Sequence, residues 1–289
     1  MRTYVNKIIY GDCLEVLKEV PDNYVHCIIT SPPYATLKKY SGDSRDLGNY
    51  RLKDQVPFLV DISRELYRVL ANNRRYCLNV MDIHESTPDG SYKLESLLWL
   101  LVPKVIDIGF VLKELIIWSK EGSFATPGSR GTVPFPPSVV LAPRYQYILV
   151  FQKPGKPDYS HITPEIKKRS EFLAKEEYGQ WANCIWNFQE EKFYSKFHPA
   201  PFPEELPHRL ITLYTFVDEI VLDPFCGTGT TCAVAKRFGR KYIGIDLKEE
   251  YCEIAEDRLK QVNLFDFDKK LGIIEKKRAT GKKGKTLWD

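Results

Sequence analysis

The chain has 289 residues, a formal net charge of +4, 43% hydrophobic residues and 28% charged residues. These values are ordinary for a globular protein that has one large domain, with or without a small lobe. No apolar run is long enough for a bilayer span or a signal peptide, so we expect a cytoplasmic protein.

The cysteines are odd in number, are scattered along the chain and form no Cys-x-x-Cys pair. This usage is typical of reduced thiols and not of a disulfide framework. A zinc site requires clustered ligands, and the histidines form no such cluster with these cysteines, so we expect no metal. The seven cysteines are Cys13, Cys27, Cys77, Cys184, Cys226, Cys232 and Cys252.

The first elements in the chain alternate between strand and helix. A strand is expected over Asn6–Gly11 and is followed by a helix over Cys13–Glu19, in which apolar residues recur at helical spacing. Asp12 is placed to cap that helix. A compact apolar strand over Val25–Thr30 then stops at Ser31-Pro32-Pro33, because proline cannot continue a strand ladder.

The middle of the chain continues this alternation. Helices are expected over 56–70 and 94–108, the second kinked or split by Pro103, and strands over 76–81, 110–118 and 145–151. The segment 119–144 is rich in Gly and Pro and joins two strands, so we expect a loop above the catalytic edge. Residues 152–197 are polar, aromatic and irregular, and are interpreted as an inserted lobe.

The last part of the chain repeats strand and helix. We expect helices over 204–216, 230–238 and 248–262, with strands over 219–222 and 242–245. Such alternation predicts a doubly wound, mostly parallel α/β sheet with helices on both faces. The predicted organisation is a catalytic half over 1–151, a recognition insertion over 152–197, a cofactor half over 198–265 and a basic, flexible tail over 266–289.

A glycine loop links two of these elements. Val221-Leu222-Asp223-Pro224-Phe225-Cys226-Gly227-Thr228-Gly229-Thr230-Thr231 has the order strand, loop, helix, and Asp246 ends the next strand. An acid at that strand end suits the hydroxyls of a ribose. The third glycine of a dinucleotide fingerprint and the Lys of a P-loop are both absent. S-adenosylmethionine, which has a ribose and a cationic sulfonium but no phosphate, fits better beside Asp223.

Ser31-Pro32-Pro33-Tyr34 follows a strand at the edge where open α/β sheets bind ligands. The prolines stiffen the backbone and remove N–H donors, which leaves carbonyl oxygens and a serine hydroxyl as acceptors. An exocyclic base amine is a poor nucleophile that such acceptors can hold and activate. The aromatic face of Tyr34 can stack a base that has left the duplex. A simple polyproline turn is the alternative interpretation of this tetrapeptide.

Together the two segments resemble the permuted, β-type DNA amino-methyltransferases. Thr30-Ser31-Pro32-Pro33-Tyr34 is similar to their catalytic motif and Asp223 to Thr231 to their cofactor motif. His198-Pro199-Ala200-Pro201-Phe202-Pro203-Glu204 resembles the segment that precedes the cofactor motif, and Tyr145–Lys153 resembles a family strand. The resemblance implies a seven-stranded Rossmann-like sheet and cofactor contacts from Asp12, Cys13, Thr30, His198, Pro199, Phe202, Pro203, Asp223, Pro224, Phe225, Gly227, Thr228, Gly229, Thr230, Thr231 and Asp246.

The order of these segments indicates a permutation. The strands that end at Asp223 and Asp246 require a third neighbour, yet the chain continues only into its basic tail. The N-terminal strand, with Gly11-Asp12 at its tip, can fill that vacancy. By resemblance, Asp12 would then lie near the adenine amine of the cofactor.

Serine at position 31 resembles the cytosine-N4 enzymes, whereas adenine-N6 enzymes mostly have Asp or Asn there. We therefore expect N4 methylation of a flipped cytosine in double-stranded DNA, with adenine N6 as the alternative target. Ser31 and the Pro32 carbonyl would hold the amine. Chemistry at cytosine C5 needs a thiol at the strand end, and none is there. RNA methylation, small-molecule methylation and an inactive nucleic-acid-binding fold remain open, as do the oligomeric state and pairing with a restriction endonuclease.

Basic residues are expected to contact DNA at several places. The tail from residue 268 has eight basic and three acidic residues. We expect this tail either to attract phosphates or to form a solvated terminus. In the lobe we expect amides to read base edges and Trp181 and Trp186 to form a small core. The candidate phosphate contacts are Lys120, Arg130, Arg144, Lys167, Lys168 and Arg169.

Overall fold

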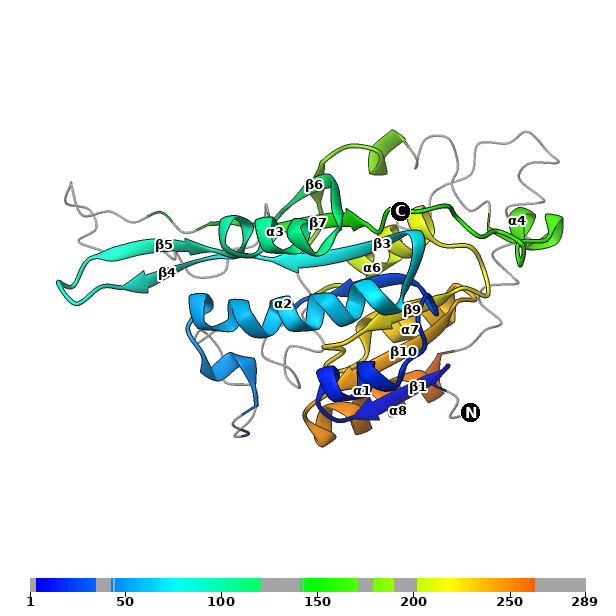
Figure 1. Cartoon of the computed structure of the whole chain (residues 1–289), viewed down its shortest axis with the longest axis horizontal. Coiled ribbons are helices and arrows are strands. Elements are labelled where there is room, and N and C mark those ends of the chain that lie inside the picture. The colour runs from blue at the N-terminus through cyan, green and yellow to red at the C-terminus, as the bar shows by residue number, and fades with distance from the viewer. Residues whose placement is uncertain are drawn as a thin grey trace.

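A twisted β-sheet runs through the protein and carries helices on both of its faces (Figure 1). The computed structural model describes residues 4–34, 43, 45–120, 141, 143–170, 179–189 and 202–262. Its elements in chain order are β1 (Lys7–Tyr10), α1 (Cys13–Glu19), β2 (Val25–Thr30), η2 (Leu47–Asn49), α2 (Leu52–Val69), β3 (Leu70–Val80), β4 (Asp82–Ser86), β5 (Tyr92–Ser96), α3 (Leu97–Ile108), β6 (Val111–Ser119), β7 (Tyr145–Gln152), α4 (Pro164–Arg169), β8 (Ile185–Asn187), α6 (Glu205–Tyr214), β9 (Ile220–Asp223), α7 (Thr230–Arg237), β10 (Lys241–Asp246) and α8 (Glu249–Gln261).

The strand order within the described residues is β1-β10-β9-β2-β3-β7-β6-β8. Only β7 is antiparallel to its neighbours, and the other pairs are parallel. The doubly wound, mostly parallel α/β fold is therefore confirmed. The sheet has eight strands and not the expected seven, because Ile185–Asn187 pairs with the end of β6 and adds an edge strand.

The N-terminal strand fills the vacancy left by the last β-α unit. β1 pairs in parallel with β10, with Tyr10 opposite Asp246, and Gly11 N donates to Asp246 O at 2.9 Å. In Figure 1 the blue N-terminal strand lies beside the orange C-terminal strand. The sheet therefore has the permuted order expected from the sequence, with the N-terminal strand beside the last strand of the chain.

Each face of the sheet packs against its own group of helices. Ile28 of β2 faces the cluster that includes Leu17 of α1 and Leu66 of α2. Its neighbour Ile29 faces the opposite cluster, which includes Leu210 of α6 and residues of α7. Since successive strand side chains point to opposite faces, a strand covered on both sides is mostly apolar, as Val25–Thr30 is apart from His26 and Thr30. No helix among the described residues is long and apolar enough to cross a membrane.

The region around residue 94 differs from the expectation. Leu94 pairs with His84 in a two-stranded hairpin formed by β4 and β5, and the expected helix begins only at Leu97. Ser96 caps that helix through a 3.1 Å bond that Leu98 N donates to its hydroxyl. The helix then continues through Pro103 without splitting. Pro103 is on the exposed side, where solvent can satisfy the carbonyl that proline leaves without a donor.

The described parts of the segment 152–197 lie at two separate places and do not form a small core of their own. Ser170 Oγ, directly after α4, accepts a 2.9 Å bond from Val217 N, which precedes β9. Trp181 and Trp186 are buried, as expected, but Trp186 packs into the main core with Trp118. Short apolar patches can complete an existing core as readily as they form a new one, so composition alone does not reveal this arrangement.

Candidate active site

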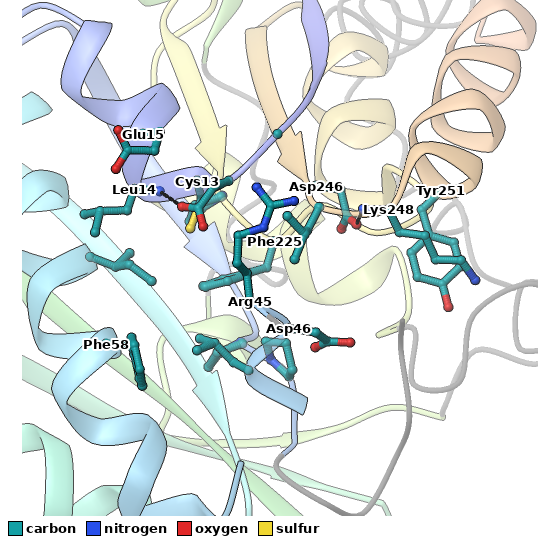
Figure 2. Close-up of a pocket in the computed structure, with 18 of the residues that line it drawn as sticks. Cys13, Leu14, Glu15, Arg45, Asp46, Phe58, Phe225, Asp246, Lys248 and Tyr251 are labelled. Atoms are coloured by element: carbon teal, nitrogen blue, oxygen red, sulfur yellow. Dashed lines mark hydrogen bonds between the residues drawn. The ribbon is translucent and has the colours of Figure 1, made fainter. Parts of the chain in front are cut away.

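A cavity of about 460 Å³ opens at the carboxyl ends of β1, β2, β9 and β10. Figure 2 shows Cys13 to Glu15 of α1 and Phe58 of α2 on one side, with Asp246, Lys248 and Tyr251 on the other. The lining residues are Gly11, Asp12, Cys13, Leu14, Glu15, Ser31, Pro32, Pro33, Tyr34, Arg45, Asp46, Leu47, Tyr50, Phe58, Ile62, Pro224, Phe225, Asp246, Leu247, Lys248 and Tyr251. The cavity thus unites the N-terminal Ser-Pro-Pro-Tyr segment with the C-terminal loop.

The first side of the cavity is built by the turn after β1. Asp12 caps α1, because its Oδ1 accepts a 2.9 Å bond from Leu14 N, and it also lines the cavity. The cap expected from the sequence is therefore present. Burial raises the pKa of the neighbouring Cys13 thiol, so this group is a neutral wall of the cavity and not a nucleophile.

Asp246 forms the opposite side, at the end of β10. Its Oδ2 accepts a 2.8 Å bond from Gly227 N and its Oδ1 accepts a 2.9 Å bond from Lys248 N. Burial raises the pKa of this carboxyl in spite of both bonds, and the charge of nearby Asp46 adds to the rise. Asp12, Asp46 and Asp246 together make the wall acidic, which favours a cationic ligand over a phosphate.

Asp223 is placed differently from the expectation, because it does not line the cavity. It is buried behind the loop and accepts bonds from Thr30 Oγ1 (2.7 Å), Thr231 Oγ1 (2.6 Å) and Phe225 N (3.1 Å). Burial raises the pKa of Asp223 to about 6, although these bonds oppose the rise. Thr30 and Thr231 are likewise buried within this network and away from the cavity wall.

The glycine loop also has a structural explanation. Gly229 has φ of +77°, and a Cβ there would lie 2.7 Å from the Cβ of Ala255 in α8. This glycine therefore allows α7 and α8 to pack closely, and the adjacent Thr228 and Thr230 are buried, with Thr230 Oγ1 accepting a 2.9 Å bond from Arg258. Pro224 and Phe225 of the loop line the cavity. Gly227 does not line it, but its N–H donates to the Asp246 carboxylate, which does.

The segment before the cofactor motif is only partly described. Phe202 packs against the core and Pro203 is buried at the start of α6, and neither lines the cavity. His198 and Pro199 lie outside the described residues. Cys226 is buried, and burial raises the pKa of its thiol well above the usual range, so it packs as a small apolar residue.

Ser31-Pro32-Pro33-Tyr34 forms the edge of the cavity at the end of β2. Ser31 Oγ lies 2.8 Å from the Tyr34 hydroxyl and donates a 3.0 Å bond to the main-chain carbonyl of Asn79. The hydroxyl of Tyr34 is also within hydrogen-bond distance of the buried amides of Asn79 and Gln146. Neither amide was predicted from the sequence, because only the register of β2, β3 and β7 brings them to Ser31.

The cavity contains further residues that the sequence did not indicate. Arg45 and Lys248 are each ion-paired, with Asp43 at 2.6 Å and Glu250 at 3.0 Å respectively. These cavity residues follow no recognised motif, and the helical pattern of α2 identifies Ile62 only as core. The residues not predicted for the site are Gly11, Leu14, Glu15, Arg45, Asp46, Leu47, Tyr50, Phe58, Ile62, Leu247, Lys248 and Tyr251.

The basic residues expected to contact DNA lie in two groups, one at the carboxyl ends of the parallel strands and one at their amino ends. Lys120 follows β6 and its N–H donates a 2.9 Å bond to Arg144 O, so both lie at the carboxyl edge of β3, near the cavity. Lys167, Lys168 and Arg169 belong to α4, which packs near Val217 at the opposite edge. Arg169 pairs there with Asp218 at 3.6 Å. Arg130, most of the loop 119–144 and the tail 266–289 lie outside the described residues.

One group of potential metal ligands occurs among the described residues, remote from the cavity. Ligand atoms of His26, His161 and Glu219 lie within 4.8 Å of one another. His26 Nδ1 accepts a 3.2 Å bond from Ile220 N, so the neutral ring has its hydrogen on Nε2 and offers no second lone pair. Arg74 already donates to the same Glu219 oxygen that His161 contacts at 3.0 Å. Hydrogen bonds and charge pairing thus account for this group.

A profile of the DNA methylase family matches residues 25–257. The chain therefore belongs to the DNA methylase family. Among curated relatives, the type II methyltransferase M.MjaI of Methanocaldococcus jannaschii is 29% identical, with 88% of this chain and 91% of that protein covered. The type II methyltransferase M.BglII of Bacillus subtilis is 28% identical, with 88% and 69% covered.

Solved structures agree with this assignment. TTHA0409 from Thermus thermophilus, which is named as a DNA modification methylase and was solved with S-adenosyl-L-methionine, is 30% identical with a TM-score of 0.72. The match covers 89% of this chain and 95% of that one. The cytosine-N4-specific PvuII DNA methyltransferase has a TM-score of 0.64 at 21% identity, with 91% and 90% covered, and supports the fold alone.

Proposed function

We propose that this chain is a site-specific DNA methyltransferase that methylates the exocyclic N4 amine of a cytosine flipped out of double-stranded DNA. The observation that carries the proposal is the acceptor-rich Ser31-Pro32-Pro33-Tyr34 edge in the same cavity as Asp12 and Asp246. A related enzyme with adenine N6 as its target is the second candidate, because family membership covers both kinds of amine.

S-adenosylmethionine is the cofactor that fits this cavity. The acidic wall of Asp12, Asp46 and Asp246 complements a cation, while Phe58, Phe225 and Tyr251 offer apolar and aromatic surface. Asp246 is held by two backbone N–H groups in a position where its carboxylate can accept from ribose hydroxyls. When bound, the cofactor supplies an electrophilic methyl group on a sulfonium.

The residues of the chain act mainly by positioning the target amine. The Ser31 hydroxyl oxygen and the Pro32 carbonyl accept the two amine hydrogens and hold the nitrogen at the cavity edge. The ring of Tyr34 stacks on the extruded base while its hydroxyl is fixed from behind. Such positioning lowers the barrier by removing the entropy cost of orientation. No cysteine thiolate is needed, in contrast to chemistry at cytosine C5.

Lys120 and Arg144 are proposed to contact DNA phosphates, because both lie at the cavity edge of the sheet. Phosphate contacts of this kind position the duplex but do not select a sequence. Lys167, Lys168 and Arg169 are not proposed as contacts near the target base. Pairing with a restriction endonuclease of the same specificity is proposed from the likeness to type II methyltransferases.

The proposal is tested with Ser31→Ala and Tyr34→Ala. Methyl incorporation into genomic DNA and cofactor binding are measured separately for each variant. We expect incorporation to fall by about 10²-fold, as for loss of a group that acts in the transition state, while cofactor affinity changes little. Turnover close to wild type in both variants would contradict the assignment of the catalytic edge.

A further inference from the structure

Two buried amide side chains, Asn79 of β3 and Gln146 of β7, lie directly behind the catalytic edge. Their residues are only 2% and 4% exposed, and neither lines the cavity. Thr30 is opposite Leu78 in the parallel pair of β2 and β3, which brings Ser31 beside Asn79. A buried polar pair at this position requires an explanation, because apolar residues would pack there without the cost of burying amides.

The Asn79 amide donates on one side to Gln146 and on the other to the catalytic edge. Asn79 Nδ2 lies 2.7 Å from Gln146 Oε1 and 3.1 Å from the hydroxyl oxygen of Tyr34. Its distance to Ser31 Oγ, at 3.4 Å, is longer and makes a weaker contact. Because Gln146 Oε1 can only accept, the nitrogen end of Asn79 must face Gln146 and hence also Tyr34.

The main chain of Asn79 determines the direction of the remaining hydrogen bonds. The main-chain carbonyl of Asn79 can only accept, and it receives the hydroxyl hydrogen of Ser31 at 3.0 Å. The 2.8 Å contact between Ser31 Oγ and the Tyr34 hydroxyl must then be donated by Tyr34. The competing bond from Tyr34 to Gln146 Oε1 is longer, at 3.2 Å, and that oxygen already receives Asn79 Nδ2.

The bonds therefore run in one direction around a ring that begins and ends on Asn79. Its side-chain amide donates to Tyr34, Tyr34 donates to Ser31, and Ser31 donates to the main-chain carbonyl of Asn79. Ser31 has no hydrogen left for the cavity that it lines, but its oxygen has two lone pairs, of which Tyr34 uses one. The group that Ser31 presents to a target base is a hydrogen-bond acceptor only.

We propose that Asn79 is a positioning residue, which fixes the hydroxyl of Ser31 as an acceptor and thereby selects an amino group over a carbonyl at the target base. This inference rests on the proposed function. Cytosine has an amine at C4 that can donate to this edge. Thymine has a carbonyl at the same position, and two acceptor oxygens facing each other cannot form a hydrogen bond. The ring thus favours cytosine before any methyl transfer takes place.

Asn79→Asp breaks the ring at Tyr34 with little change in shape and leaves the main-chain carbonyl that accepts from Ser31 in place. A carboxylate at this position cannot donate to Tyr34 but accepts from it, so Tyr34 no longer donates to Ser31. Below the pKa of the new carboxyl group, which burial raises, its O–H can donate to Tyr34 again. We expect kcat to fall about tenfold or more above that pKa and to recover as the pH falls, with KM for DNA changed less than about twofold.

The matched control is Asn73→Asp on the same strand. Asn73 lies at the other end of β3, and its Oδ1 accepts from Gln152, which aspartate also allows. Its φ of 62° is one that aspartate tolerates. We expect this variant to show wild-type kcat and the wild-type pH profile.

A binding measurement separates base selection from turnover. The modified site is first mapped on genomic DNA treated with the wild-type protein, and duplexes are made with cytosine or thymine at the target. Fluorescence anisotropy then gives the ratio of the two dissociation constants. We expect the preference for cytosine to shrink several-fold in Asn79→Asp and to stay constant in Asn73→Asp.

If the wild-type protein methylates no cytosine, the proposed function fails, and the ring then has no target to select. If it does, an unchanged kcat and cytosine preference in Asn79→Asp overturns the positioning role alone. A loss of kcat that does not recover at low pH also overturns it. Should Asn79→Asp fail to fold, Tyr34→Phe interrupts the same ring, and an unchanged cytosine preference in that variant is equally decisive against the inference.

Discussion

Thr30 and Asp223 are 193 residues apart in sequence, yet Thr30 Oγ1 donates a 2.7 Å hydrogen bond to Asp223 Oδ1 inside the core. Thr30 is the last residue of β2, directly before the Ser-Pro-Pro-Tyr edge, and Asp223 is the last residue of β9, directly before the glycine loop. This one bond therefore joins the catalytic and cofactor halves of the permuted chain at the point where both strands end.

Thr30→Val is expected to destabilise the protein. The substitution keeps the shape of the side chain but removes the hydroxyl donor, so that Asp223 Oδ1 keeps the bond from Phe225 N and loses the one from β2. Loss of a hydrogen bond to a buried charged group costs about 1.5–3 kcal/mol. Denaturant unfolding measures this loss, and Thr30→Ser, which retains the hydroxyl, is the control. Equal stability of the Val and Ser variants would show that the bond contributes nothing.

The stability of the protein should depend on the protonation of Asp223. Burial raises the pKa of this carboxyl from 3.8 to about 6. Below pH 4 the group is protonated in the folded and the unfolded chain. Between pH 4 and pH 6 the unfolded chain loses the proton first, so the folded state loses stability as the pH rises, and above pH 6 the loss is constant.

Asp223→Asn removes this titration. The melting temperature of the wild type, measured relative to that of the variant, should therefore fall from pH 4 to about pH 6 and then level off. The full change corresponds to about 3 kcal/mol, because one pKa unit is about 1.4 kcal/mol. A difference that is constant from pH 4 to pH 7 would mean that the Asp223 carboxyl titrates alike in both states.

Gly229→Ala tests the explanation of the glycine loop by helix packing. The new Cβ would lie 2.7 Å from the Cβ of Ala255, and its backbone would keep a φ of +77°. We expect a loss of about 1–3 kcal/mol from backbone strain, with overpacking added. Ala255→Gly removes the contacting Cβ and should recover part of the loss in the double variant. Additive effects in a double-mutant cycle would argue against the contact.

Asp246→Asn is expected to weaken cofactor binding while the fold is retained. The amide nitrogen cannot accept from Gly227 N or Lys248 N, and the negative charge of the acidic wall falls by one. A hydrogen bond to a charged group contributes about 1.5–3 kcal/mol, so the dissociation constant for S-adenosylmethionine should rise about tenfold or more. Calorimetry measures it, with exposed Glu253→Gln as the control. Unchanged affinity would remove Asp246 from the cofactor site.

The parts of the fold that follow from local patterns were predictable. The apolar run Val25–Thr30 and the stop at Pro32 identify a buried strand with its functional end, and the unpaired N-terminal strand identifies its partner β10. The helix predicted from residue 94 begins only at Leu97, because Leu94 pairs with His84 in a hairpin that local spacing does not reveal. Trp181 and Trp186 are buried as expected, but the packing of Trp186 into the core beside Trp118 depends on the pairing of β8 with β6.

The supporting residues of the site were not predictable, for a physical reason. Asn79 and Gln146 lie in strands whose neighbouring residues are mostly apolar and suggest only a buried core. The registers of β2, β3 and β7 place the two amides behind Ser31. Asp223 was expected to contact the cofactor from the resemblance to the family's cofactor motif. Its orientation is instead determined by the hydroxyls of Thr30 and Thr231, which come from two other elements.

The most direct measurement incubates the wild-type protein with unmethylated genomic DNA and S-adenosylmethionine that has a labelled methyl group, digests the DNA to nucleosides and identifies the labelled product by mass spectrometry. The resemblance of Ser31 to the serine of the cytosine-N4 enzymes predicts N4-methylcytosine. Labelled N6-methyladenine in its place would contradict the assignment of the target base. No labelled nucleoside at all would contradict the proposed methyl transfer to DNA.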